Sequence, residues 1–152
     1  MYAVIRLRGS IGVPRKIEDT LRMLRLKRVN HCVLLPETDS FKGMLQVAKD
    51  YITWGEINKE TLVELLKVKL RTKENKRVDE KVLKEITGYD NFESFAEDLI
   101  KGKVKIKNFE ELNPVFRLHP PRKGFKSIKT HWPKGDLGYR GDAINELIKR
   151  MI

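Results

Sequence analysis

Residues 2–17, YAVIRLRGSIGVPRKI, change from strand-like to helix-like patterning within one short stretch. Apolar residues alternate over 2–8, so that every second one shares a face, which is typical of a strand. Two glycines follow, and Pro14 occupies a position where the first turn of a helix accepts proline. The stretch therefore predicts a strand, a loop and the start of a helix.

The same two periodicities continue to residue 57. Apolar residues three and four positions apart predict a helix over 14–26. Short apolar runs predict strands over 31–36 and 51–57, and Ser40 is the expected N-cap of a helix between them. The first 57 residues therefore predict a β-α-β-α-β unit.

The remainder of the chain is predominantly helical in pattern. Asparagine or aspartate occupies the expected N-cap of each helix in the middle of the chain. The expected elements are helices over 59–71, 80–88, 92–101 and 141–151, and a short strand over 115–118. We expect an α+β fold, with a small sheet and a ferredoxin-like core over 1–57, and a mostly helical subdomain over 58–152 that carries a basic extended loop.

The charge of the chain favours a polyanionic partner. Its 152 residues include 32 Lys and Arg against 21 Asp and Glu, a net charge of +11. The excess lies at the two ends, because the net charge is +4 over 1–57, +1 over 58–113 and +6 over 114–152. This balance is typical of proteins that bind nucleic acid and, less often, a membrane surface.

Cysteine usage and hydropathy narrow the class of protein further. Cys32 is the single cysteine, so no internal disulfide forms and an intracellular protein is expected. Arg6 interrupts the N-terminus before a signal-peptide apolar core is reached. No apolar run approaches the roughly 20 residues of a membrane span.

The loop and helix start within residues 6–16 form a candidate anion site. Free backbone N–H groups, the positive end of a helix dipole and the basic residues Arg8, Arg15 and Lys16 would attract a phosphate. The stretch lacks the spacing of a P-loop or a Rossmann fingerprint. Three interpretations stay open: an RNA phosphate, a small phosphate substrate, or a turn with solvated charges.

Further basic residues follow along the predicted first helix and its exit. They are Arg22, Arg25, Lys27 and Arg28. Arg15, Arg22 and Arg25 are spaced so that all three can line one face of a helix. A solvated helix face is the alternative to phosphate contacts.

Residues 117–135, RLHPPRKGFKSIKTHWPKG, carry six basic residues and no acidic one. The segment has little apolar surface to bury, so we expect it to be mobile alone and ordered by nucleic acid. A disordered basic loop is the alternative. Candidate contacts to phosphates, riboses and bases are Arg117, His119, Arg122, Lys123, Lys126, Lys129, His131, Trp132 and Lys134. Trp132 is expected on a ribose, on a base or on the protein's own last helix.

No catalytic or metal-binding constellation emerges from the sequence. His31 and Cys32 are adjacent in a predicted strand, so they point to opposite faces, and a buried, inert thiol is expected. His31, His119 and His131 lack the spacing of metal ligands. We therefore expect no cofactor, no metal and no catalytic residue.

Taken together, these residues resemble the ribosomal large-subunit protein family numbered thirty in bacteria and seven in eukaryotes, in its longer archaeal form. The first part of the match comprises Ser10-Ile11-Gly12, Pro14, Thr20-Leu21, Leu24-Arg25-Leu26, Lys27, Asn30, Asp39-Ser40 and Gly43-Met44. The second comprises Phe116-Arg117-Leu118, Pro121-Arg122, Gly124 and Gly135-Asp136-Leu137-Gly138-Tyr139-Arg140. The family's usual Thr-Pro after the aspartate is Ser40-Phe41 here.

The resemblance implies a three-stranded sheet with its first strand central, two helices on one face and an added C-terminal subdomain. It also implies a non-enzymatic, archaeal, cytoplasmic protein of translation, which binds large-subunit ribosomal RNA near the 5S RNA region, beside neighbouring ribosomal proteins. RNA contacts would lie in 8–16, the first helix and 117–140, which adds Ser10 and Arg140 to the candidates. Two alternatives stay open: a ferredoxin-like acylphosphate hydrolase using Arg8 or Arg15, and an RNA-binding regulator acting off the ribosome.

Overall fold

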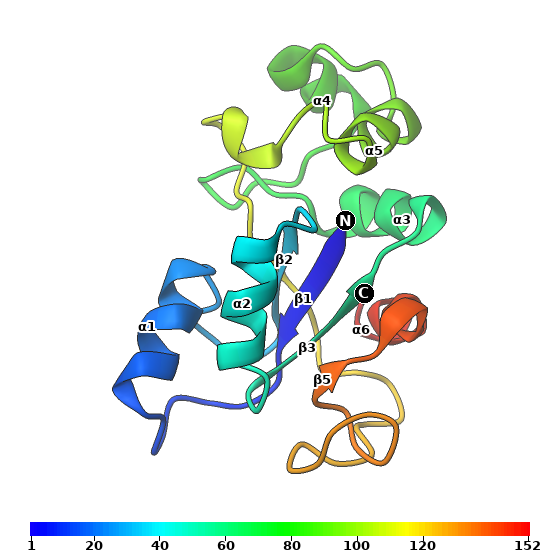
Figure 1. Cartoon of the computed structure of the whole chain (residues 1–152). Helices are drawn as coiled ribbons and strands as arrows, with labels where there is room; N and C mark the ends of the chain where they lie inside the picture. The colour runs from blue at the N-terminus through cyan, green and yellow to red at the C-terminus, as the bar shows by residue number, and fades with distance from the viewer.

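The computed structural model describes all 152 residues, and it places one five-stranded sheet between two layers of helices (Figure 1). The elements are β1 (Tyr2–Arg6), α1 (Arg15–Met23), β2 (His31–Leu35), α2 (Asp39–Val47), β3 (Ile52–Glu56), α3 (Lys59–Lys69), α4 (Glu80–Thr87), α5 (Phe92–Ile100), β4 (Phe116–Arg117), β5 (Gly138–Tyr139) and α6 (Ile144–Met151). Single turns of 3-10 helix, η1 (Ile106–Asn108) and η2 (Gly141–Ala143), precede β4 and α6. The α+β prediction is confirmed.

The strands lie in the order β4-β2-β1-β3-β5, with β1 in the centre. β1 lies between β2 and β3, as the family resemblance implied, and the structure shows that it is antiparallel to both. β4 adds to β2 in antiparallel fashion, and β5 adds to β3 in parallel fashion. The chain after residue 57 therefore supplies both edges of the sheet that the first 57 residues begin.

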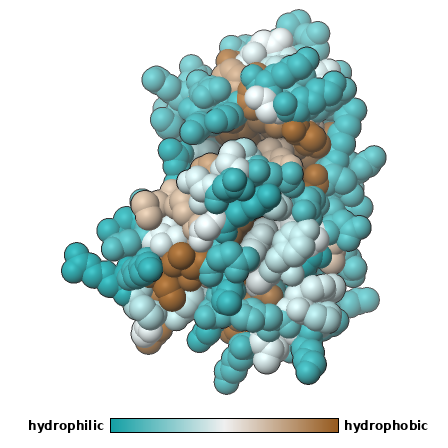
Figure 2. Space-filling model, viewed as in Figure 1, coloured by the Kyte–Doolittle hydropathy of each residue, from teal (hydrophilic) through white to brown (hydrophobic).

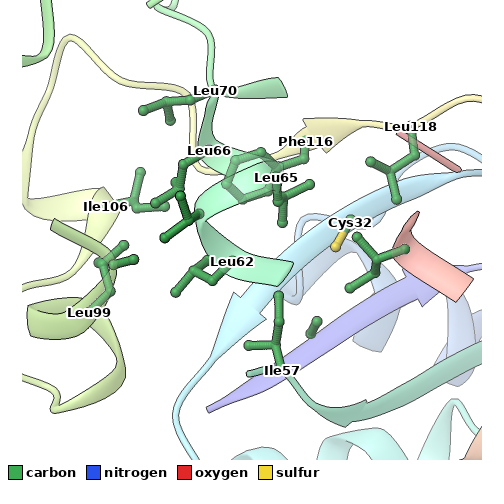
Figure 3. Packing of buried hydrophobic residues seen from close by; sticks show 14 of the residues in the cluster. Cys32, Ile57, Leu62, Leu65, Leu66, Leu70, Leu99, Ile106, Phe116 and Leu118 are labelled. Carbon is green, nitrogen blue, oxygen red and sulfur yellow. The ribbon is translucent and has the colours of Figure 1, made fainter. Parts of the chain in front are cut away.

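Both faces of β1 are buried, and for this reason the strand is apolar at nearly every position. Val4 lies in a cluster of 11 buried residues beneath α1 and α2. Ala3 and Ile5 lie in a cluster of 25 residues, which the helices from the second part of the chain cover. Figure 3 shows the leucines of α3 in this larger cluster, near Cys32 and Phe116. The division of the chain into units 1–57 and 58–152 stays a prediction. Residues from both ranges contribute to the same sheet and to the same larger cluster.

The caps of the middle helices are confirmed. The side chains of Asn58, Asp79 and Asn91 accept hydrogen bonds from backbone N–H groups in the first turns of α3, α4 and α5. The expected cap at Ser40 is wrong, because the Thr38 hydroxyl accepts from the Phe41 N–H and α2 begins one residue before Ser40. None of the helices combines the length and the apolar character that crossing a membrane requires.

Candidate nucleic-acid interface

The topology brings four connections to one end of the sheet. β1 ends where β2 and β3 begin, because Ile5 is opposite Cys32 and Arg6 is opposite Ile52. The chain leaves β4 and enters β5 at this end too, since β4 is antiparallel to β2 and β5 is parallel to β3. We call these connections the basic end, and they comprise residues 7–14, 26–30, 48–51 and 118–137 (lower part of Figure 1).

Positive charge dominates the basic end. It holds nine basic residues, namely Arg8, Lys27, Arg28, Lys49, Arg122, Lys123, Lys126, Lys129 and Lys134. Only Asp50 and Asp136 oppose them. Asp50 faces His131, with 2.9 Å between Oδ1 and Nε2, and Asp136 is paired with Arg140. The nine cations therefore have no free carboxylate among these four connections, which leaves them available to an external polyanion.

The buried guanidinium of Arg6 fixes the loop that follows β1. It donates to the Leu26 carbonyl at 2.7 Å, to the Arg8 carbonyl at 2.8 Å and to Ser10 Oγ at 3.3 Å. Burial lowers the pKa of Arg6. Arg6 thereby joins two connections of the basic end. This positioning role was not predicted from the sequence, although an arginine between apolar strand residues was a signal for it.

The start of α1 is open to a ligand. No side chain caps this helix, whose N-cap position is Pro14. Ile11 is fully exposed at the tip of the preceding loop, beside two glycines and a serine. Arg8 lies over the Tyr51 ring at 5.0 Å, which holds its charge near the loop. A phosphate at this point would meet free backbone N–H groups and the positive end of the helix dipole.

The structure places most of the predicted contact residues at the surface. Exposed are Ser10, Arg15, Lys16, Arg22, Arg25, Lys27, Arg28, Arg117, His119, Arg122, Lys123, Lys126, Lys129, His131 and Lys134. Arg8 and Trp132 are partly buried, and Arg140 is buried.

Two of the sequence-based placements need correction. Arg25 does not share a helix face with Arg15 and Arg22, because α1 ends at Met23 and Arg25 adopts a left-handed backbone with φ of 65°. Arg25 lines a groove on another side of the protein. Arg140 is 5% exposed and is engaged inside the fold, so its guanidinium is not available to a phosphate.

The protein itself supplies partners for segment 117–135, whereas the expectation that nucleic acid orders this segment stays a prediction. The buried carboxylate of Asp136 accepts hydrogen bonds from the backbone N–H groups of Lys126 and Ser127. The His119 and Arg122 N–H groups donate to carbonyls at the end of α6. The segment is therefore tied to the sheet and to the last helix before any ligand binds.

Trp132 belongs to the same framework. Its ring lies 4.8 Å from the Arg140 guanidinium and 5.2 Å from the Lys126 ammonium, in cation–π geometry. Arg140 in turn donates to Thr53 Oγ1 and to Asp136, both at 2.9 Å. The structure thus places the Trp132 ring against Lys126 of its own segment and against Arg140, the residue that follows β5.

Polar groups near the start of β2 lack partners within the protein. Asn30 Oδ1 and His31 Nδ1 are buried and make no hydrogen bond. Burial lowers the pKa of His31, and the charges of Arg117 and Arg28 lower it further. Arg117 and Arg28 therefore place positive charge around the buried start of β2.

Cys32 is buried, as the sequence predicted. It is 0% exposed, and burial raises the pKa of its thiol to about 12. The thiol is therefore protonated at neutral pH and unsuited to nucleophilic chemistry.

Comparison with known proteins identifies close relatives. The family model described as ribosomal protein L30p/L7e matches residues 2–52. The large ribosomal subunit protein uL30 of Archaeoglobus fulgidus is 52% identical over 151 residues, which cover 99% of each chain. The proteins of the same name from Thermoplasma volcanium and Methanosphaera stadtmanae are each 48% identical over 153 residues. Both alignments span all of this chain and cover 93% and 100% of the respective relatives.

Proposed function

Because the chain belongs to the ribosomal protein L30p/L7e family, we propose that its basic end is the surface through which it binds ribosomal RNA. The chain is a structural, non-enzymatic constituent of the large ribosomal subunit, in which it binds ribosomal RNA and other ribosomal proteins. The observation that carries the proposal is the set of nine cations at one end of the sheet, where both carboxylates are already engaged.

In the proposed interaction, electrostatic attraction to phosphates provides the affinity, and the fixed shape of the loops provides the selectivity. Each Lys or Arg that neutralises a phosphate releases counterions, which favours binding whatever the sequence of the RNA. Arg6 and Asp136 hold the two principal loops in defined shapes, so the phosphates must fit a fixed arrangement of charges. Ile11 at the loop tip adds an apolar surface for a ribose or a base.

The proposed RNA-binding residues are those predicted from the sequence that remain exposed or partly exposed at this end and along α1. They are Arg8, Ser10, Arg15, Lys16, Arg22, Lys27, Arg28, Arg117, His119, Arg122, Lys123, Lys126, Lys129, His131, Trp132 and Lys134. We place the interface near the 5S RNA region of the subunit, as the family resemblance implies. The family assignment does not favour the acylphosphate hydrolase or the regulator acting off the ribosome.

A charge-matched pair of variants tests the location of the surface. We expect replacement of Lys123, Lys126, Lys129 and Lys134 by glutamine to weaken binding to large-subunit ribosomal RNA. The slope of log affinity against log salt should become shallower by roughly 0.7–0.9 for each phosphate that the variant no longer neutralises. The measurement is a titration of the full chain with this RNA at several salt concentrations.

The control variant replaces Lys73, Lys76, Lys81 and Lys84, which are equally exposed but lie in the lobe that carries α4. It lowers the net charge by the same amount, so we expect its salt slope to stay close to that of the unaltered protein. Equal slopes for the two variants would contradict the proposal, because net charge alone would then govern binding. Thermal unfolding of both variants verifies that neither has lost its fold.

A further inference from the structure

An apolar groove lies between the sheet and the lobe of α4 and α5, on a different side from the basic end. Its volume is about 380 Å³, and 11 of its 19 lining residues are hydrophobic. One wall is formed by the end of α1, by β2 and by Phe41 of α2, and the other by residues 99–107. In Figure 2, hydrophobic surface lies between the lobe of α4 and α5 at the top and the sheet with its helices below. Met23, one of the lining residues, is 65% exposed.

The groove exposes an unpaired edge of β2. Along a strand, every second residue points its backbone N–H and C=O to the same side. Cys32 points these groups towards Phe116 of β4, so Leu34, two residues later, points its N–H and C=O to that side as well. β4 pairs only with His31 and Cys32, and it does not extend to Leu34. The Leu34 backbone makes none of the hydrogen bonds found outside the ladders. Pro114, which the register of β4 would place opposite Leu34, also lines the groove and has no N–H, so the Leu34 carbonyl stays free to accept from an N–H group of a docked segment.

The rim of the groove is basic. Its charged lining residues are Arg25, Lys101, Lys105 and Lys107, opposed by Glu37 alone. Glu37 is paired with the N-terminal ammonium at 3.6 Å, and Lys101 is paired with Glu97 at 2.9 Å. Three cations therefore remain without a carboxylate partner around an apolar floor.

We propose that an extended segment of a neighbouring large-subunit protein docks in this groove, an inference that rests on the proposed function. The segment would pair with the Leu34 edge of β2, place apolar side chains on the floor and direct acidic side chains to Arg25, Lys105 and Lys107. An extended conformation follows from the open strand edge, and acidic residues follow from the charge of the rim.

The apolar floor favours a protein segment over RNA. The phosphates of RNA would gain from Lys105 and Lys107, but the backbone of a nucleic acid offers little apolar surface for Met23, Leu24 and Phe41. A peptide satisfies the floor, the edge and the rim together. RNA in the groove is accordingly the result that would overturn the proposal.

Site-specific photo-cross-linking within assembled large subunits tests the proposal. A benzophenone amino acid replaces Met23 in the full chain, subunits that have incorporated it are purified and irradiated, and mass spectrometry identifies the attached group. We expect one ribosomal protein, cross-linked through an extended segment that carries both apolar and acidic residues. Attachment to RNA, or no attachment despite normal incorporation, would overturn the inference.

Two further variants make the result specific. With the probe at Met23, the double replacement Lys105→Glu and Lys107→Glu should lower the cross-linking yield about tenfold, because like charges would then face each other at the rim. An unchanged yield would contradict the proposed acidic partner. The same probe at Ile128, which is 39% exposed at the basic end, should attach to RNA. Failure at Ile128 alone would count against the proposed RNA surface, and failure at Met23 alone would count against the groove.

Discussion

Replacement of Asp136 by asparagine is expected to lower the free energy of unfolding of the isolated protein by about 3–5 kcal/mol. Both Asp136 and Arg140 are almost completely buried, and their charged atoms are 2.9 Å apart. Asparagine preserves the size of the side chain but removes its charge, so the guanidinium of Arg140 would stay in the interior without its counterion. Asparagine keeps only one acceptor oxygen, so either Arg140 or the N–H groups of Lys126 and Ser127 also lose a hydrogen-bond acceptor. Urea unfolding measures it.

Asp142→Asn is the matched control for this substitution. Asp142 is exposed and lies in the 3-10 turn η2 that precedes the last helix, and its carboxylate makes no ion pair. Its replacement should cost no more than about 1 kcal/mol, through the helix dipole. Equal, small losses in the two variants would show that the buried pair does not stabilise the segment 117–137. The expectation that RNA orders this segment would then regain support.

Replacement of Gly55 by alanine should have a comparable effect for a steric reason. Gly55 lies in β3 directly beneath η2, and an added Cβ atom would lie 1.8 Å from the Gly141 carbonyl oxygen and 2.8 Å from its carbon. These are backbone atoms, and β3 is held between β1 and β5, so neither side can move without breaking hydrogen bonds. We expect a loss of about 3 kcal/mol or more, at the upper end of overpacking effects.

Gly43→Ala provides the control of opposite sign. Gly43 lies within α2, and an added Cβ atom would have no neighbour within 4 Å. Alanine is the better helix former, so this change should stabilise the protein by about 0.5–1 kcal/mol. Thermal unfolding of the two variants measures both effects. A Gly55 variant as stable as the Gly43 variant would contradict the close packing of β3 against η2.

The sequence predicted those parts of the fold that local chemistry determines. The caps at Asn58, Asp79 and Asn91 were predictable because each side chain bonds within its own first turn. Strand β1 was predictable from its alternation, although only the structure shows that both of its faces are buried. Strand β5 was not predicted, because two residues are too few to show a period and their pairing depends on Thr53, 85 residues away.

The sequence predicted most of the residues of the candidate site, but it did not predict how they are arranged in space. The basic residues were identified from charge alone, and most of them are exposed. The engaged state of Arg140 was not predictable, because a count of charges does not reveal that an aspartate one residue beyond the segment forms the buried pair. Similarly, the convergence of four connections at one end follows from strand order, which no single stretch of the sequence contains.

Lysine footprinting tests the central claim most directly, namely that the basic end faces ribosomal RNA. The full chain is acetylated free in solution and within purified large subunits, and mass spectrometry gives the modification of each lysine in both states. We predict that Lys16, Lys27, Lys123, Lys126, Lys129 and Lys134 react in the free protein and are protected in the subunit, while Lys73, Lys81 and Lys84 lose much less of their reactivity. Unchanged reactivity of the first group in the subunit, together with protection of the second, would contradict the account.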